Sequence, residues 1–360
     1  MSRPLQLGVL LGDDIGLEVV PQAVKVVVAA ARAAGLPIVW HELPIGRSAF
    51  DRFGTTLPDG TLEALEPLDG WILGPIGHRE YPKVPAAINP HPILRKHFDL
   101  FANIRPAKSY RTLPSVHQDV DLVIVRENNE GFQPDRNVVA GTGEFRPTHD
   151  VTISVRVITR AGSSKVARAA FELARTRRKQ LAVIHKDTVF KLGCGMFAEE
   201  CRALAAEYPD VAYEEIIVDT FAMRLAMKPQ AYDVVVTTNL FGDILSDEAA
   251  GLVGGLGMAP ALSAGTRHAM AQATHGSAPD IAGRNVANPY AMIVSAQMLL
   301  DWLGRTSSEP RATAAARAIE RAVDETIAAR HALTPDLGGN ATTVEMSDAI
   351  AARAAAQAQA

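Results

Sequence analysis

The segment of residues 239–250, NLFGDILSDEAA, constrains the fold of this chain more than any other stretch. It follows an apolar run, residues 232–238, that predicts a buried strand, and its own pattern predicts the start of a helix. Asp243 and Asp247 are four residues apart, which places both carboxylates on one face of that helix. Because ligands of α/β proteins bind where strands end and helices begin, the segment predicts a ligand site there.

Two interpretations of this acidic pair are open. Mg²⁺ and Mn²⁺ prefer carboxylate oxygens and water as ligands, so the pair is a candidate site for a hard divalent cation. Alternatively, Asp243 is the N-cap of the helix and Asp247 is a solvated surface residue. The choice between them depends on other parts of the chain.

Apolar runs alternate with helical patterns over most of the chain, which predicts an α/β fold. Buried strands are expected at residues 6–11, 39–43, 71–73, 121–125, 181–184 and 211–218. Helices are expected at residues 19–34, 163–176, 220–227, 289–303 and 311–329. A capping box formed by Thr342 and Glu345 predicts one further helix. The length of 360 residues indicates about two domains.

Basic side chains stand near the ends of predicted elements. Arg95, Arg105 and Arg126 fit a pocket for a dicarboxylate, because a guanidinium group binds a carboxylate through two parallel hydrogen bonds. Each of them alone also fits a surface ion pair. Lys186 follows the strand expected at residues 181–184 and can act as a general acid or base if it is desolvated, although a solvated turn lysine has the same pattern.

Two glycine-containing loops are candidates for binding a nucleotide. Residues 12–18, GDDIGLE, form a turn before the first predicted helix, where backbone N–H groups face a ligand. They lack the G-x-G-x-x-G fingerprint of dinucleotide-binding folds. Residues 275–283, HGSAPDIAG, can wrap a nucleotide through backbone groups, and their composition also fits an ordinary surface loop.

Composition narrows the range of partners. The formal net charge of −4 and the lack of a basic stripe in the sequence argue against nucleic acid. The sequence contains no run of 18 apolar residues and no signal-peptide pattern. We therefore expect no membrane segment and a cytoplasmic location.

Four motifs carry a resemblance to a known family: GDDIGLE at residues 12–18, GDILSD at 242–247, HGSAPDIAG at 275–283 and TPDLGG at 334–339. Together they resemble the isocitrate/isopropylmalate dehydrogenase family, the β-decarboxylating dehydrogenases, nearly end to end. The resemblance implies an α/β fold like that of isopropylmalate dehydrogenase, with two domains and a large mixed parallel and antiparallel sheet flanked by helices.

The resemblance also implies the domain boundaries and the assembly. A first, cofactor-side domain would comprise residues 1–100 plus 254–360, and a second domain, residues 101–253, would carry the dimer contacts and the metal site. The protein would form a homodimer with shared active sites. Its partner molecules would be a small dicarboxylate substrate and a nicotinamide cofactor.

By the same resemblance, Asp243 and Asp247 of one chain and Asp219 of the other would hold Mg²⁺ or Mn²⁺. Lys186, contributed across the dimer, would manage the proton of the substrate hydroxyl, and the catalytic residues would be Lys186, Asp219 and Asp243. The arginines that bind the substrate carboxylates would be Arg95, Arg105 and Arg126. A cation near the hydroxyl lowers the cost of losing its proton and also lowers the pKa of a nearby lysine.

The 275–283 loop would hold the adenosine half of the cofactor. Asp280 would accept hydrogen bonds from the ribose hydroxyls, and its charge would repel a 2′-phosphate, which favours NAD over NADP. The expected cofactor-binding residues are His275, Gly276, Ser277, Ala278, Asp280, Ile281 and Asn288.

Two departures from the family pattern bear on the reaction and the substrate. Gln133 stands where members usually carry a tyrosine that protonates the enolate, and an amide cannot donate a proton in that way. His91 and Pro92 stand where isopropylmalate enzymes tend to present leucines. The pocket is therefore expected to be small and polar, with His91 and Gln133 near the substrate, although a solvent-exposed loop histidine is the alternative for His91.

These features predict metal-dependent oxidation of a small D-malate-type 2-hydroxy dicarboxylate by NAD⁺ with β-decarboxylation, the substrate being D-malate, tartrate or a 3-alkylmalate. Three alternatives stay open. The enzyme could oxidise without decarboxylation because of Gln133, it could use 3-isopropylmalate or isocitrate, or the chain could be a non-catalytic regulatory subunit.

Overall fold

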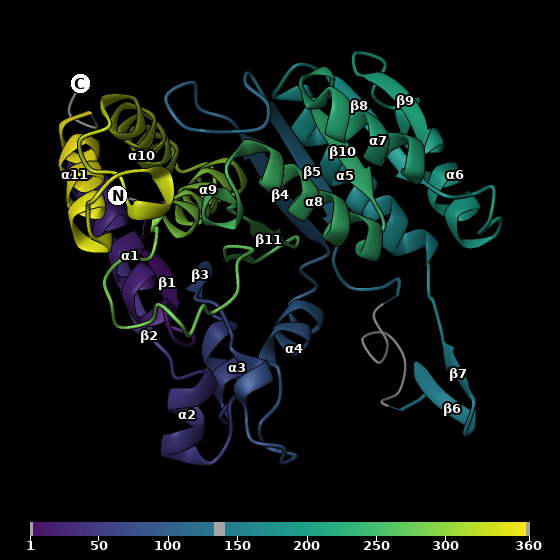
Figure 1. The fold of residues 1–360 in the computed structure, drawn as a ribbon, viewed down its shortest axis with the longest axis horizontal. Coiled ribbons are helices and arrows are strands. Elements are labelled where there is room, and N and C mark those ends of the chain that lie inside the picture. Colours follow the sequence, from purple (N-terminus) through teal and green to yellow (C-terminus); the bar gives the residue numbers. More distant parts are fainter. Residues whose placement is uncertain (1–2, 133–140, 358–360) are drawn as a thin grey trace.

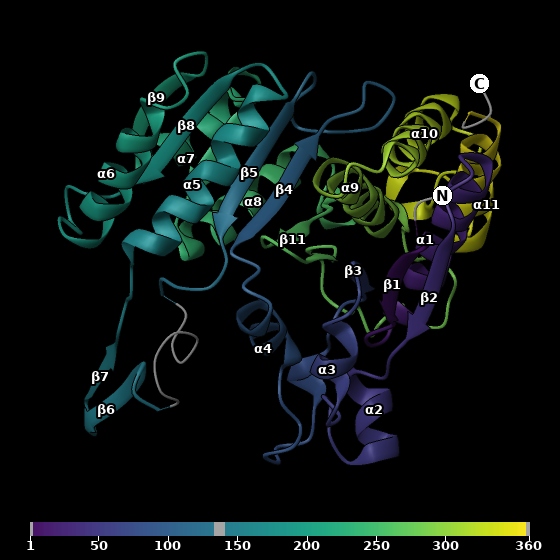
Figure 2. The same cartoon turned by 180° about the vertical axis from the view of Figure 1, so that it is seen from behind.

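A computed structural model describes residues 3–132 and 141–357, in which one ten-stranded sheet crosses the whole molecule (Figures 1 and 2). The strands of this sheet follow the order β2-β1-β3-β12-β11-β4-β5-β10-β8-β9. They span Leu5–Leu10 (β1), Ile38–Glu42 (β2), Gly70–Leu73 (β3), Ala102–Lys108 (β4), Asp121–Glu127 (β5), Gln180–His185 (β8), Ala212–Ile217 (β9), Val234–Thr237 (β10), Leu262–Ala264 (β11) and Ala269–Ala271 (β12).

Helices cover both faces of the sheet. They span Gly16–Ala33 (α1), Gly46–Phe53 (α2), Thr61–Leu65 (α3), Pro90–His97 (α4), Arg160–Arg175 (α5), Gly193–Ala205 (α6), Val218–Met227 (α7), Asn239–Val253 (α8), Tyr290–Thr306 (α9), Pro310–Ala329 (α10) and Thr343–Gln357 (α11). In Figure 1, α7 and α8 lie in front of the β5–β10–β8 strands, and Figure 2 shows α5 and α6 in front of them from the other side.

The sheet is mixed, as the family resemblance implied. β2, β1, β3 and β12 run parallel to one another, and so do β5, β10, β8 and β9. The pairings β12–β11, β11–β4 and β4–β5 between these two blocks are antiparallel. Because β5, β10, β8 and β9 are parallel, the residues that follow them meet at one edge of the sheet.

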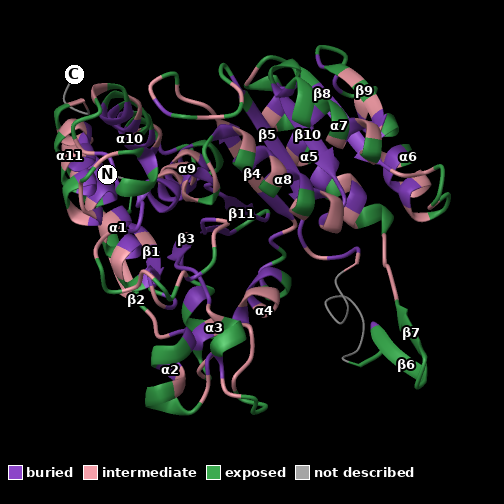
Figure 3. Cartoon of the chain, viewed as in Figure 1, coloured by how far each residue is buried: buried purple, intermediate pink, exposed green. Residues whose placement is uncertain are grey.

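β10 and the middle of β5 and β8 are apolar because helices cover both of their faces. Val234 and Val236 of β10 pack with α5 and α6, whereas Val235 between them packs with α7 and α8. This alternation follows from the two-residue period of a strand. Figure 3 shows β10 and most of β5 as buried. The strands predicted as buried at residues 39–43 and 211–218 correspond to β2 and β9, which end the sheet and are partly exposed, so the prediction of burial is wrong there.

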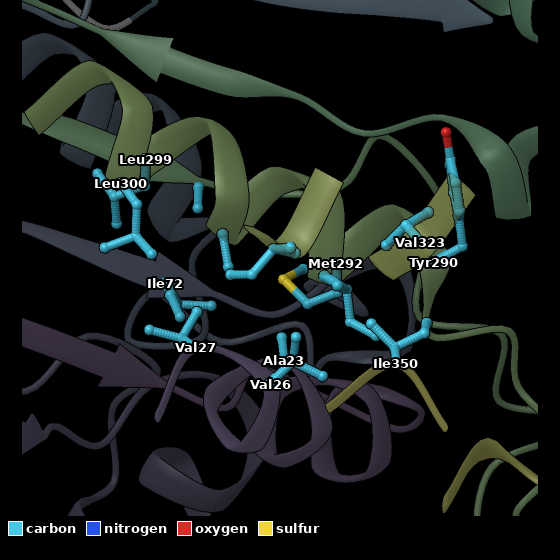
Figure 4. Packing of buried hydrophobic residues seen from close by; sticks show 14 of the residues in the cluster. Ala23, Val26, Val27, Ile72, Tyr290, Met292, Leu299, Leu300, Val323 and Ile350 are labelled. Atoms are coloured by element: carbon cyan, nitrogen blue, oxygen red, sulfur yellow. The ribbon is translucent and has the colours of Figure 1, made fainter. Parts of the chain in front are cut away.

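The largest core lies at the other end of the molecule, between β1, β3 and four helices. Side chains from α1, α9, α10 and α11 meet there, including Val26, Met292, Val323 and Ile350 (Figure 4). The capping box that predicted the last helix is confirmed, because the Glu345 backbone N–H donates to Thr342 and the Glu345 carboxylate accepts from the Thr342 backbone N–H.

A hairpin of β6 (Glu144–Thr148) and β7 (Val151–Ser154) stands away from the body in both views. The alternation of apolar and polar residues over residues 151–157 predicts a half-exposed strand. β7 forms within this range, but all residues of both strands of the hairpin are exposed in the chain. Within residues 3–132 and 141–357, no helix is both long enough and apolar enough to cross a membrane.

Candidate active site

The acidic pair lies on α8, which starts directly after β10. Thr238 is the N-cap of this helix, and Asp243 lies in its second turn. The alternative that Asp243 is the N-cap is therefore wrong. The side chains of Asp243 and Asp247 are 45% and 56% exposed, so both carboxylates remain accessible to a ligand.

Two buried arginines lie beneath these carboxylates. Arg126 on β5 contacts the Asp243 carboxylate through Nη1, and its side chain is 3% exposed. Arg105 on β4 places Nη1 3.4 Å from Asp243 Oδ1 and 3.7 Å from Asp247 Oδ1. A buried guanidinium without partners would be costly, so the acids and the arginines stabilise one another. Partial burial raises the pKa of Asp247, Arg105 opposes this shift and Asp243 adds to it.

Neutral side chains fix the orientation of both guanidinium groups. The Asn239 side-chain oxygen accepts from Arg126 Nε at 2.9 Å and from Nη2 at 2.6 Å. Arg105 donates through Nε to Asn103 at 2.9 Å and through Nη1 to Ser246 at 2.7 Å. The sequence did not predict these supporting residues. Asn239 and Ser246 nevertheless belong to the 239–250 segment that contains the acidic pair.

Gly242 explains how α8 comes so close to β5. A Cβ atom at this position would lie 2.7 Å from both Cβ and Cγ of Arg126. Any side chain at position 242 would therefore push α8 away from the arginine that Asp243 contacts.

The structure brings Lys186 and Asp219 together at the same edge of the sheet. Lys186 follows β8 and Asp219 lies in the first turn of α7, directly after β9. Lys186 Nζ forms an ion pair with Asp219 Oδ1, and this hydrogen bond is the main cause of the lowered pKa of Asp219. In the single chain the Lys186 side chain is 25% exposed and that of Asp219 is 65% exposed, so the pair lies at the surface of the chain.

A single chain does not assemble the predicted metal ligands. β9 is separated from β10 by β8, so the residues after β9 and β10 start about 10 Å apart. Asp219 therefore does not join Asp243 and Asp247. Among the side chains that the structure describes, no group of three or more His, Cys, Asp or Glu is placed to hold a metal ion.

The chemistry of the donors nevertheless fits a hard divalent cation. Asp243 and Asp247 offer oxygen atoms only, on successive turns of one helix, and both are open to solvent. Mg²⁺ and Mn²⁺ accept one or two carboxylates together with water and substrate oxygens.

Arg95 and His91 lie on α4, where they are four residues apart. Gln272, which follows β12, contacts both: Arg95 Nη2 is 3.5 Å from its Oε1, and its Nε2 contacts His91 Nε2. His91 is a half-buried helical residue, so the alternative of an exposed loop histidine is wrong. Gln272 gave no signal in the sequence.

The candidate cofactor loop is held by the first turn of α1. The backbone N–H of Ile15 donates to the Ser277 carbonyl at 3.1 Å. The Glu18 carboxylate accepts from the backbone N–H groups of Gly283 and Asn285, the second at 2.8 Å. The 12–18 and 275–283 motifs, which are more than 250 residues apart in the chain, therefore form one surface.

Other predicted cofactor residues lie around this surface. Asn288 Nδ2 donates to Asp336 Oδ2 at 2.9 Å. This hydrogen bond places the 334–339 motif, which contains Asp336, next to Asn288. Burial lowers the pKa of His275, and its Nδ1 donates to the Gly276 carbonyl at 2.9 Å. Five predicted cofactor residues remain. Gly276 and Asp280 are exposed, Ala278 and Ile281 are half-buried, and Ser277 is buried.

A profile of the isocitrate/isopropylmalate dehydrogenase family matches residues 6–350. The chain belongs to this family. The family assignment made from the four motifs is thus confirmed. As a member of the isocitrate/isopropylmalate dehydrogenase family, the protein is a decarboxylating dehydrogenase that oxidises a CH–OH group. Dependence on a nicotinamide dinucleotide and on a divalent metal ion is general in this family.

Relatives match the chain over almost its whole length. An isocitrate/homoisocitrate dehydrogenase of Thermus thermophilus is 43% identical over 340 residues, which cover 94% of this chain and 95% of that protein. A 3-isopropylmalate dehydrogenase of Archaeoglobus fulgidus is 40% identical over 348 residues, covering 95% and 97%. The crystal structure of an isocitrate dehydrogenase from Methylococcus capsulatus aligns with a TM-score of 0.84 at 39% identity and covers 97% of this chain and 99% of that one.

Gln133 is expected at the place of a tyrosine that donates a proton, and the residues that the structure describes contain no evident replacement. Gln133 lies outside the described residues. Tyr110, the phenol nearest to it in sequence among the candidates, hydrogen-bonds to Tyr290 at 3.1 Å and to Asp324 at 3.0 Å. Burial raises the pKa of Tyr110, and its partners belong to α9 and α10 rather than to the acidic pair.

Proposed function

We propose that the protein oxidises a small D-malate-type 2-hydroxy dicarboxylate with NAD⁺ and releases its β-carboxylate as CO₂. D-malate, tartrate and 3-alkylmalates are the candidate substrates. The observation that carries the proposal is the contact of the buried Arg105 and Arg126 with Asp243. Groups suited to bind carboxylates thus lie directly beside groups suited to bind a cation.

In the proposed complex, the guanidinium groups hold the substrate by its carboxylates. Arg105 and Arg126 are already oriented by Asn103 and Asn239, so little rotational freedom is lost on binding. Arg95 on α4 adds a third guanidinium from the other side of β11 and β12. Two carboxylates and one hydroxyl account for this set of donors.

The proposed base is Lys186 of a second copy of the chain, which takes the proton of the substrate hydroxyl as hydride leaves. Asp219 holds the lysine amine in place through their ion pair. Asp243 and Asp247, with Asp219 of that second copy, would hold Mg²⁺ or Mn²⁺. When bound, such a cation supplies positive charge that favours loss of the hydroxyl proton and of CO₂.

A homodimer with shared sites follows from this proposal, because Lys186 and Asp219 do not reach Asp243 in one chain. Met223 and Met227 on α7 and Ile244 on the neighbouring α8 are large apolar side chains that are exposed in the chain. Burying them against a second copy would remove apolar surface from water at the edge where the acids lie.

We also propose the two domains predicted from the sequence. Residues 1–100 plus 254–360 contain β1, β2, β3, β11 and β12, and residues 101–253 contain β4, β5, β8, β9 and β10. The boundary then falls between β11 and β4, where the antiparallel pairings lie. The arginines and the acidic pair stand next to this boundary, which suits a site that closes around its substrate.

The proposed function is tested with purified protein, Mg²⁺ or Mn²⁺, NAD⁺ and a panel of 2-hydroxy diacids, in which NADH and CO₂ are both measured. Equal amounts of NADH and CO₂ with D-malate or tartrate are expected. NADH without CO₂ would show oxidation alone, and no NADH with any diacid would indicate a binding subunit. The names of the relatives favour a second candidate, so isocitrate, homoisocitrate and 3-isopropylmalate belong in the same panel.

The preference for NAD⁺ is expected to depend on Asp280. This carboxylate is exposed on the 275–283 loop, where it would face the ribose and repel a 2′-phosphate. Asp280→Lys replaces this repulsion by attraction and should shift the ratio of kcat/KM for NADP⁺ over NAD⁺ upward by about a hundredfold. Glu325 is exposed on α10, and Glu325→Gln serves as the control in which this ratio should not change. An unchanged ratio in Asp280→Lys would show that Asp280 does not set the cofactor preference.

A further inference from the structure

The 12–18 motif contains three acidic residues, and two of them hold neighbouring segments in place. The Glu18 carboxylate accepts from the backbone N–H groups of Gly283 and Asn285. Asp13 is 4% exposed, and its carboxylate accepts from three donors. These donors are the backbone N–H of Arg47 at 2.6 Å, the backbone N–H of Gly77 at 2.7 Å and the Tyr81 hydroxyl at 2.6 Å. Both acids therefore have their hydrogen-bonding partners within the chain.

Asp14, the third acid of the motif, has no such role. Its side chain is half-buried, and among the residues that the structure describes, none donates a hydrogen bond to its carboxylate or forms an ion pair with it. Its backbone φ is +50°, a conformation that glycine adopts freely and that other residues adopt at a cost in free energy. An acid kept in this conformation without a partner in the described chain is a candidate for binding a ligand.

Asp14 lies where three segments of the chain meet. β1 and β12 are both parallel neighbours of β3, so the segments that follow these three strands leave the sheet at one edge. A Cβ atom on Gly77, in the segment after β3, would lie 3.1 Å from Asp14 Oδ2 and 2.9 Å from Ser277 Oγ, in the segment after β12. The Asp14 carboxylate and the Ser277 hydroxyl therefore border the same space, on the surface that the 12–18 and 275–283 motifs form together.

The order of residues after β12 indicates which part of a bound dinucleotide would lie at this place. Gln272 contacts Arg95, one of the proposed substrate arginines. Asp280 is the residue proposed to hold the ribose of the adenosine half. Ser277, beside Asp14, comes between the two along the segment. Because the nicotinamide has to reach the substrate for hydride transfer, the ribose that passes Asp14 is the one on the nicotinamide side.

We propose that Asp14 is a cofactor-binding residue whose carboxylate accepts hydrogen bonds from the two hydroxyls of the ribose on the nicotinamide side. The proposal rests on the proposed function, in which the 275–283 loop holds the cofactor. A carboxylate has acceptors only, and the ribose diol offers it two neighbouring O–H donors. The phosphates of the dinucleotide are repelled by the same charge and lie away from it.

Asp14→Asn tests the proposal through the binding of NADH and of ADP, measured by calorimetry on the full chain without substrate. Asparagine keeps the size of the side chain, tolerates the left-handed conformation and loses the charge. We expect the Kd of NADH to rise about tenfold, because neutral hydrogen bonds replace charge-assisted ones. ADP has no nicotinamide ribose, so its Kd should not rise.

Asp14→Gly separates this role from a role in folding. A negative charge beside the first turn of α1 also interacts favourably with the helix dipole, and this effect alone would change the thermal stability but not the binding of NADH. Glycine adopts a φ of +50° without strain, so Asp14→Gly should keep the fold and still raise the Kd of NADH by about tenfold. Asp119→Asn is the matched control, because Asp119 also has a positive φ, +59°, and makes an exposed ion pair with Arg111. It should change neither Kd.

Two results would overturn the proposal. An unchanged Kd of NADH in both variants would show that Asp14 does not touch the cofactor. An equal rise in the Kd of ADP would place Asp14 at the adenosine half instead. Because binding needs no turnover, these outcomes are separate from a failure of the proposed function, which the diacid panel would reveal as absence of NADH formation. A wild-type chain that binds no NADH would contradict both.

Discussion

Asp243→Asn should lower kcat by about a thousandfold or more and abolish the response to Mg²⁺ and Mn²⁺. Asp243 is the carboxylate that both buried arginines contact, and it is one of two acids on α8 open to a cation. An amide keeps the shape of the side chain but loses the charge that a hard cation requires. It also leaves Arg105 and Arg126 with one anionic partner fewer, so substrate carboxylates would meet a more positive pocket.

The measurement combines steady-state kinetics over a range of metal concentrations with direct binding of Mn²⁺. Asp348→Asn is the matched control, because Asp348 on α11 makes only an exposed ion pair with Lys25 among the interactions seen here. Thermal unfolding of both variants separates loss of the site from loss of the fold. If Asp243→Asn kept the metal dependence of the wild-type enzyme, Asp243 and Asp247 could not be the metal ligands.

The sequence predicted the edge of the sheet where the site lies because that edge is built from long, periodic elements. β5, β8 and β10 contain apolar runs, since helices cover both faces of the sheet there, and polar residues stand at or directly after the ends of these runs. β9 at the edge of the sheet is more polar, and Asp219 follows it after one residue. Arg126, Lys186, Asp219 and Asp243 were therefore placed at or after the ends of strands without coordinates. The buried arginines were not predicted as buried, because their sequence also fits surface ion pairs.

The elements that the sequence did not predict are short or lack an apolar period. β11 and β12 have three residues each, and β4 contains Asn103, Arg105 and Pro106 in place of an apolar run. These strands are defined by the register in which they pair with distant strands, which a local pattern does not record. The contact of Arg126 with Asp243, 117 residues apart in the chain, depends on the same pairing.

The supporting residues escaped prediction for a related reason. Gln272 and Asn103 are uncharged and common in loops, so nothing in their local sequence distinguishes them. They matter only because folding places each against a buried guanidinium. His91 was predicted near the substrate, but its contact with Gln272, 181 residues further along the chain, depends on how α4 packs against the end of β12.

Mixing two inactive variants should restore activity if the active sites are shared. Lys186→Ala removes the proposed base, and we expect it to lower kcat by about a thousandfold, as Asp243→Asn does. In a dimer that contains one copy of each variant, one site combines Asp243 of the first copy with Lys186 of the second, and both of these are intact. The other site carries both substitutions.

Random pairing puts half of the dimers in the mixed form, and each mixed dimer has one intact site of two. Unfolding the two variants together and refolding them should therefore give roughly a quarter of the wild-type activity per chain, although each variant alone gives almost none. Lys186→Ala mixed with Lys191→Ala, which leaves the proposed site residues of the second chain unchanged, controls for the refolding yield. No recovery in the first mixture, with normal yield in the control, would mean that Lys186 and Asp243 serve the same site from one chain. Because β8 lies between β9 and β10, Lys186 and Asp219 would then have to move toward Asp243 within the chain.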